Sequence, residues 1–137
     1  MTETSVFTKI RLREIPGEII YQDELIFVPM TIAPHNPGHC LVVPIEEIGN
    51  FEEVPEKLYL HIMKVAQHIA RVQRRLYDCP KVALAAVGMS VDHTHIHVFP
   101  LYAEKDMDPD SAKQPPAEEI ALEADRLRTA LKENPPA

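Results

Sequence analysis

Three histidines occupy every second position in the stretch VDHTHIHVFP, residues 91–100. They are His93, His95 and His97. Side chains alternate between the two faces of a β-strand, so a strand here would place all three imidazoles on one face. Neighbouring rings would then be roughly 6–7 Å apart. A simple core strand does not explain this arrangement, because buried imidazoles need polar partners.

Phosphorus chemistry is one use for such a face. An imidazole that is neutral near pH 7 has a free ring nitrogen that can attack phosphorus and form an N-phosphoryl intermediate, which water later breaks. The nucleophile needs an acceptor on its other nitrogen and donors for the phosphate oxygens. Gly88 and Ser90, just before the histidines, could supply close backbone approach and a hydroxyl donor.

Two other interpretations of the histidines stay open. Imidazole is a common metal ligand, but two histidines on a strand need a further carboxylate or cysteine to complete the shell. Alternation places Asp92 on the opposite face; His39 could help, but Cys40 and Cys79 have no metal-like spacing. The stretch could also be a histidine-rich strand without a chemical role.

The composition limits the possible partners. The chain has 137 residues, of which 45% are hydrophobic, and this predicts one globular domain. A net charge of −7 argues against nucleic-acid binding, yet a local pocket can still take a small anion. No secretory leader or membrane-length apolar run is evident, so we expect a cytoplasmic protein without membrane contact. The two cysteines should be buried and reduced.

Hydrophobic spacing predicts the elements that position the histidines. Apolar residues three and four positions apart, from Leu58 to Leu76, indicate a long helix over residues 55–77. The other expected elements are a short helix over 5–12, a hairpin within 19–28, strands over 39–43, 81–87 and 94–100, and an amphipathic helix over 118–131. The short connections favour an α+β fold with a mostly antiparallel sheet.

The C-terminal part differs in composition. Residues 104–116, EKDMDPDSAKQPP, are rich in charge and proline and indicate a mobile linker. We therefore expect one domain over residues 1–103, and a linker with a C-terminal helix over 104–137. This second part could also fold over the site and set specificity. His35, in the loop APHNPGH beside the predicted site, could touch a substrate, but we favour a position on the loop surface.

The residues also resemble a known family. HTHIHVF is similar to the signature of the histidine triad (HIT) superfamily, in which histidines alternate with apolar or small residues. FTKIRLREIPGEIIYQDE and NPGHCLVVPIEEI resemble the family's N-terminal stretch and its Pro-Gly-His strand. The resemblance covers about residues 5–102 and is closest to the Hint branch. It implies a five-stranded antiparallel sheet, one long helix and a C-terminal helix, with sheets joined across a homodimer.

The resemblance also implies a function. It indicates a nucleotidyl hydrolase or transferase that acts at the α-phosphate of a nucleoside phosphoramidate or adenylate through a covalent nucleotidyl-histidine. The partner would be a small-molecule nucleotide, and no cofactor is expected. One alternative is a dinucleoside polyphosphate hydrolase. Another is a nucleotide-binding or interaction protein with weak or vestigial catalysis.

Site residues follow from the same resemblance. His95 matches the nucleophile, and His97 matches the residue that contacts the phosphate and the leaving-group side. His93 and His39 match the pair that orients the nucleophile, with the His93 carbonyl as acceptor for His95. The residues matched to nucleotide binding are Ser90, Gly88, Phe7, Val6, Ile10, Ile32 and Thr31. The apolar members could equally be core residues, and both roles can hold.

Some positions depart from the family pattern. Thr31 stands where the family has a ribose-binding aspartate, and Met89 stands where it has a glutamine. These changes bear on nucleoside binding more than on phosphorus chemistry. Many family members hold zinc through Cys-x-x-Cys and a histidine, but the matching positions here are Ser5, Thr8 and Glu47. Hydroxyl groups are poor zinc ligands, so no metal site is expected.

Overall fold

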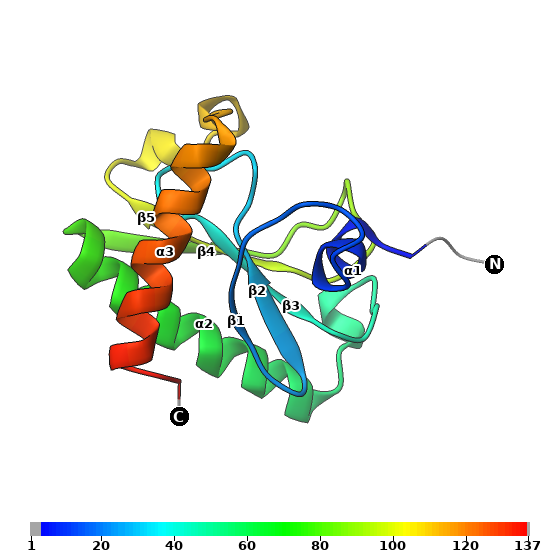
Figure 1. Ribbon diagram of the computed structural model, residues 1–137. Helices are drawn as coiled ribbons and strands as arrows, with labels where there is room; N and C mark the ends of the chain where they lie inside the picture. Colours follow the sequence, from blue (N-terminus) through cyan, green and yellow to red (C-terminus); the bar gives the residue numbers. More distant parts are fainter. Residues whose placement is uncertain (1–3, 137) are drawn as a thin grey trace.

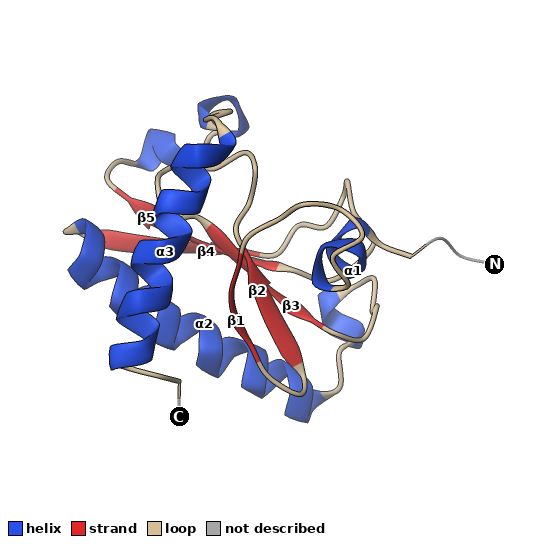
Figure 2. Cartoon of the chain, in the orientation of Figure 1, coloured by secondary structure: helices blue, strands red, loops and turns tan. Residues whose placement is uncertain are grey.

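A computed structural model describes residues 4–136; residues 1–3 and 137, at the two ends of the predicted division, lie outside it. The helices and strands in chain order are α1 (Val6–Arg11), β1 (Ile19–Gln22), β2 (Ile26–Pro29), β3 (Cys40–Pro44), α2 (Glu56–Tyr77), β4 (Lys81–Ala85), β5 (Ile96–Leu101) and α3 (Ala117–Glu133) (Figure 2). Short 3₁₀ turns occupy Phe51–Glu53 (η1), Glu104–Met107 (η2) and Pro109–Ser111 (η3). None of the helices in residues 4–136 is long and apolar enough to span a membrane.

The strands form one antiparallel sheet in the order β1-β2-β3-β5-β4 (Figure 1). The α+β class and the five-stranded antiparallel sheet are therefore confirmed. The predicted boundaries agree within one or two residues. Around the loop after β4, β4 ends at Ala85 and β5 begins at Ile96, two residues inside each predicted strand.

Alternation along the strands gives the sheet two different faces. In β2, Ile26 and Val28 join the larger core, whereas Phe27 joins a smaller cluster. The larger core packs α2 and α3 on one face of the sheet, and the smaller cluster packs Phe7 of α1 on the other. Side chains that point toward α1 therefore belong to a separate environment from the main core.

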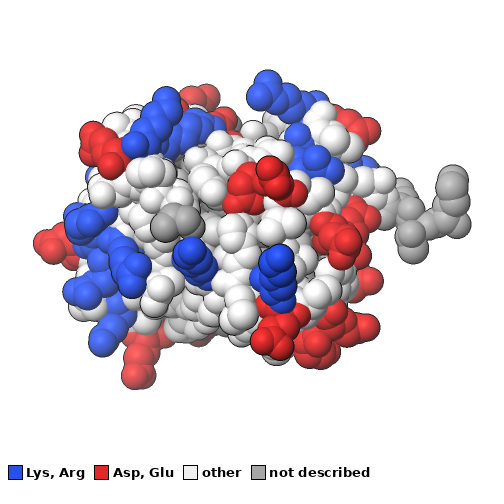
Figure 3. Space-filling view, turned by 90° about the horizontal axis from the view of Figure 1, so that it is seen from below, with Lys and Arg blue, Asp and Glu red and all other residues white. Residues whose placement is uncertain are grey.

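The apolar stripe of α2 lies in the main core, as its spacing predicts. Ile62, Val65 and Ile69 are buried there. The first turn carries Glu56 and the last turn carries arginines, which suits the helix dipole. Seen from below in Figure 3, basic and acidic side chains are mixed over this face, with a group of basic ones at the left and a group of acidic ones at the lower right.

A buried glutamine on α2 ties two strands together. Gln73 is fully buried, and its Nε2 donates to the carbonyls of Gly38 (2.9 Å) and Val98 (3.0 Å). Gly38 precedes His39, and Val98 follows His97. The amide therefore fixes the backbone beside both histidines from the opposite face of the sheet.

The turn before His39 requires glycine. Gly38 has φ of 93°, a left-handed conformation that side chains rarely adopt. A Cβ at this position would also overlap the ring of Tyr77, which packs against the turn. The sharp entry into β3 thus depends on the missing side chain at position 38.

Residues 104–116 form turns that bind to the rest of the protein rather than a free linker. The carboxylate of Asp106 accepts hydrogen bonds from the backbone N–H of Tyr102 (2.9 Å) and from Nδ2 of Asn36 (3.1 Å). These bonds, the Tyr102 one foremost, lower the pKa of Asp106. Ser111 Oγ lies 2.7 Å from Nδ1 of His35. The division of the chain after residue 103 remains a prediction.

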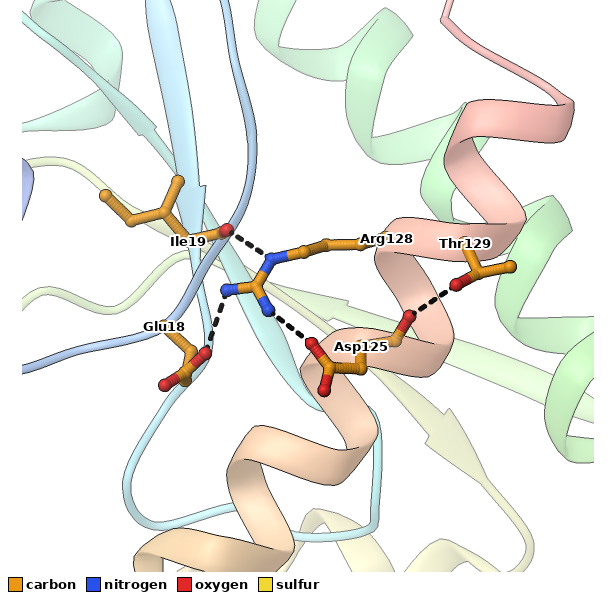
Figure 4. Close-up of polar contacts among 5 residues, drawn as sticks. All are labelled: Glu18, Ile19, Asp125, Arg128 and Thr129. Atoms are coloured by element: carbon orange, nitrogen blue, oxygen red, sulfur yellow. Dashed lines mark hydrogen bonds and ion pairs between the residues drawn. The ribbon is translucent and has the colours of Figure 1, made fainter.

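Helix α3 is anchored to β1 by an arginine (Figure 4). Arg128 donates to the carbonyl of Ile19 (3.0 Å), and its other nitrogens contact the carboxylates of Glu18 (2.8 Å) and Asp125 (2.8 Å). Ile19 is the first residue of an edge strand, so this contact covers part of one edge of the sheet.

We predict that Gln73→Leu lowers the free energy of unfolding by about 2 kcal/mol, because two buried carbonyls lose the Gln73 amide as a hydrogen-bond donor. Urea denaturation would measure the change. Gln67→Leu places the same substitution on an exposed position of α2 and should have little effect. Equal effects of the two substitutions would contradict a clamping role for Gln73.

Candidate active site

The three histidines of the motif do not share one strand, so this part of the sequence prediction is wrong. β5 begins at Ile96, and His93 and His95 lie in the loop before it. The backbone there is held elsewhere: Thr94 donates to the carbonyl of Ile48 through both its N–H (2.7 Å) and its hydroxyl (2.6 Å). Ile96 faces the main core, as alternation predicts.

His95 has a fixed proton position. Its Nδ1 lies 2.7 Å from the backbone carbonyl of His93. A carbonyl oxygen can only accept, so Nδ1 carries the hydrogen and the neutral ring has its lone pair on Nε2. His95 is buried, and the ring of Phe7 lies 4.7 Å away between centroids. The local geometry therefore leaves Nε2 as the basic nitrogen.

The ring hydrogens of His39 and His97 are also fixed, but here the fixing group is a backbone donor instead of a backbone acceptor. The backbone N–H of His35 donates to Nδ1 of His39 (3.1 Å), so the hydrogen of His39 is on Nε2. That nitrogen lies 2.9 Å from Nδ1 of His97 and donates to it. His97 therefore carries its own hydrogen on Nε2. Neighbouring rings thus differ: His95 has a lone pair on Nε2, and His97 has a donor.

Burial keeps these rings neutral. Desolvation lowers the pKa of His97 to about 4, with a further contribution from His95. Desolvation also lowers the pKa of His39 to about 2, with His97 as the next cause. The pKa values of His93 and His95 are lowered by burial as well. The tautomers assigned above to His95, His39 and His97 consequently apply at neutral pH.

A cavity of about 530 Å³ opens beside His95 and His97. It collects the residues that the sequence proposes for nucleotide binding: Val6, Phe7, Ile10, Thr31, Ile32, Gly88 and Ser90. Phe7 is buried in the small cluster, whereas Ile32 is 76% exposed at the rim. Phe7 therefore both packs in the core and lines the cavity, whereas Ile32 only lines the cavity.

The remaining predicted residues lie close to this cavity. His39 lines its wall, while His93 is fully buried behind His95. Gly88 has φ of 71°, so the loop turns there in a way that glycine allows. The hydroxyl of Thr31 accepts the backbone N–H of Ala33 (3.2 Å).

His35 is half-buried beside the cavity, rather than exposed on the loop surface as we favoured from the sequence. Its ring stacks on Phe99, with centroids 4.9 Å apart, and on His39 at 5.5 Å. It also lines the cavity. The hydrogen bond to Ser111 connects this ring to the C-terminal segment.

A family model described as the HIT domain matches residues 12–104. The chain belongs to the HIT family. An uncharacterised HIT-like protein of Methanocaldococcus jannaschii is 32% identical over 101 residues, which cover 71% of this chain and 78% of the relative. The purine nucleoside phosphoramidase of Escherichia coli is 30% identical over 105 residues, covering 72% of this chain and 88% of that enzyme.

Solved structures extend the likeness of this HIT protein beyond the family model. A HIT-like protein of Bartonella henselae involved in cell-cycle regulation superposes with a TM-score of 0.84 at 24% identity. The match covers 96% of this chain and 98% of that one, so it includes the region of α3. It is a likeness of fold.

The positions that hold zinc in many HIT proteins do not offer a zinc donor set here. Ser5 and Thr8 supply hydroxyl groups, and both direct hydrogen bonds into their surroundings: Thr8 Oγ1 to Glu47 (2.7 Å), and Ser5 Oγ to His93 (2.5 Å). Zinc prefers thiolate and imidazole ligands. Within residues 4–136, no group of three or more histidine, cysteine or acidic side chains is arranged to hold a metal.

Some contacts of the HIT site have no signal in the sequence. The carbonyl of Pro44 accepts from Nε2 of His93 (2.7 Å), and the hydroxyl of Ser5 meets its Nδ1. These partners are 49 and 88 residues away in the chain. Gln73 did carry a signal, because it follows the buried Ile69 by four positions and so falls on the core face of α2.

We predict that the lowered pKa values of His39 and His97 make the protein less stable in mild acid. The unfolded rings titrate near 6.5, so below that pH the unfolded chain binds protons that the folded chain does not. The free energy of unfolding should fall as pH falls from 6.5 toward 4, by up to about 1.4 kcal/mol per pH unit for each ring. Urea denaturation at several pH values would measure this.

His97→Gln tests the assignment, because it removes one titrating ring and keeps a polar side chain. The variant's free energy of unfolding should depend less steeply on pH than that of the unaltered protein over the same interval. Parallel curves for the two proteins would show that His97 does not contribute to the acid sensitivity.

Proposed function

We propose that this HIT protein is a nucleotidyl hydrolase or transferase that cleaves a nucleoside phosphoramidate or adenylate at the α-phosphate. The observation that carries the proposal is the hydrogen bond from His95 Nδ1 to the His93 carbonyl. It leaves a neutral Nε2 lone pair beside a cavity large enough for a small ligand. The 30% identical phosphoramidase of Escherichia coli supports the choice of substrate class.

The proposed reaction has two steps. In the first, the Nε2 lone pair of His95 attacks the α-phosphorus while the bond from phosphorus to the leaving nitrogen breaks. The leaving nitrogen takes a proton from solvent and departs as an amine. In the second, water attacks phosphorus, its oxygen stays on the nucleotide, a proton returns to solvent, and His95 is released in its original form.

His97 serves this reaction as a hydrogen-bond donor. Its pKa of about 4 keeps the ring neutral, so it offers Nε2–H rather than a positive charge. That donor can stabilise charge on the phosphoryl oxygens and on the leaving-group side during each step. His39 holds His97 in this tautomer, and His93 holds His95.

The same cavity suggests how the nucleoside is bound. Val6, Phe7, Ile10 and Ile32 supply apolar surface for a base. Thr31 uses its hydroxyl oxygen within its own loop and retains a hydroxyl hydrogen that can donate to a ribose. Gly88 and Ser90 line the cavity where the phosphate would lie between them and the histidines.

We predict that the protein converts adenosine 5′-phosphoramidate to the monophosphate and that His95→Ala abolishes this activity, with a loss of more than about 10³-fold. His97→Ala should lose about 10²-fold, the effect of removing one donor to the transition state. Product formation is followed by chromatography. His68→Ala, on α2, removes a histidine that does not line the cavity and should leave the rate unchanged.

An intermediate provides a second measurement for the same variants. Rapid mixing followed by intact-mass analysis under alkaline conditions should show a nucleotidyl adduct on the wild-type protein and none on His95→Ala. If wild type and His95→Ala convert the phosphoramidate at the same rate, or both remain inert with several nucleotide classes, the proposed activity is wrong.

A further inference from the structure

The hydroxyl of Ser5 joins the start of α1 to the buried ring of His93. Ser5 is the N-cap of α1, and its Oγ accepts the N–H of Thr8 (3.2 Å). The same oxygen lies 2.5 Å from Nδ1 of His93. Since Nε2 of His93 donates to the Pro44 carbonyl, Nδ1 is an acceptor, and the Ser5 hydroxyl is its donor.

A carboxylate holds this hydroxyl in place. Oε1 of Glu47 accepts the backbone N–H of Ser5 (2.7 Å) and the hydroxyl of Thr8 (2.7 Å). These bonds, the one from Thr8 foremost, lower the pKa of Glu47 and keep it an acceptor. Ser5, Thr8 and Glu47 thus form a closed set of hydrogen bonds, which we call the Ser5 latch.

The latch acts on the same residue that holds His95. The carbonyl of His93 accepts from His95 Nδ1, so the position of His93 sets the direction of the His95 ring. Helix α1 touches that ring directly as well, because Phe7 lies 4.7 Å from His95 and 5.9 Å from His93 between ring centroids. One short helix therefore meets the nucleophile through an aromatic contact and through the buried His93.

We propose that Ser5, Thr8 and Glu47 are positioning residues that set the orientation of the His95 imidazole through His93. The inference rests on the proposed function for its kinetic consequence, because orientation matters only if His95 attacks the substrate. N-capping alone does not use the hydroxyl hydrogen of Ser5, since the cap accepts from Thr8. That hydrogen is directed to His93, whose Nδ1 lies 2.5 Å from Ser5 Oγ, whereas the other acceptor in reach, the Thr8 hydroxyl, lies 3.4 Å away.

The first test compares Ser5→Ala with Ser5→Thr. Ser5→Ala removes the donor to His93 and should lower kcat about tenfold while KM changes by less than about twofold. Ser5→Thr keeps a hydroxyl and should restore most of kcat. An equal loss in both variants, or a loss that appears in KM alone, would overturn the proposal.

The second test uses Glu47, where a matched pair separates charge from hydrogen bonding. Both bonds to Glu47 end on one oxygen, and the amide oxygen of Glu47→Gln can accept both. Glu47→Gln should therefore keep kcat within about twofold, and Glu47→Leu should lose about tenfold. A large loss in Glu47→Gln would show that the charge, and not the latch, is what matters.

The third measurement needs no substrate and so distinguishes the latch from the proposed function. Nitrogen-15 chemical shifts of the imidazoles report which ring nitrogen carries the hydrogen and which accepts a bond. Ser5→Ala should shift His93 Nδ1 and also change the His95 signals, whereas Ser5→Thr should resemble wild type. If wild type proves inert but these shifts change, the proposed function fails and the latch stands. Unchanged His95 signals would overturn the latch.

Discussion

One hydrogen bond, from the backbone N–H of His35 to Nδ1 of His39, determines which ring nitrogens of His39 and His97 donate and which accept. A backbone amide can only donate, so His39 must present Nε2–H to His97, and His97 must present Nε2–H in turn. The opposite tautomer would leave two donors or two lone pairs facing each other in a buried place. Because their pKa values are low, His39 and His97 stay neutral at neutral pH and keep these tautomers. A backbone amide in a loop thus determines, through the side chains of His39 and His97, that a hydrogen-bond donor faces the cavity.

A second backbone group, the carbonyl of His93, places a hydrogen-bond acceptor beside the donor of His97. The carbonyl of His93 makes His95 an acceptor at Nε2, and the rings of His95 and His97 lie 5.0 Å apart between centroids. Main-chain groups move less than surface side chains, so a donor and an acceptor are held side by side by the fold itself. Gln73 fixes the backbone beside His39 and His97 from the far side of the sheet. The placement of the donor of His97 beside the acceptor of His95 therefore depends on the packing of α2 against the sheet.

Local pattern predicted more of the fold than of the site. The spacing of the α2 stripe is a property of neighbouring residues, and the structure confirms it. The start of β5 was placed too early because Thr94 is held by Ile48, a contact across 46 residues that alternation does not contain. The cavity unites residues near position 7, 32, 88 and 95, and their order in the chain says nothing of their distance. The family resemblance predicts that they form one site, whereas the contact of Ser5 with His93 joins residues 88 positions apart and has no signal in the sequence.

The two edges of the sheet are unequal, and this limits how copies of the chain could associate. At β1, Arg128 occupies the Ile19 carbonyl and α3 packs alongside; at β4, no strand within residues 4–136 pairs with the outer side. If two copies joined their β4 edges around a twofold axis, each would use its open edge and present its partly covered β1 edge outward. The contact of Arg128 with the Ile19 carbonyl would then disfavour the pairing of a further strand at β1.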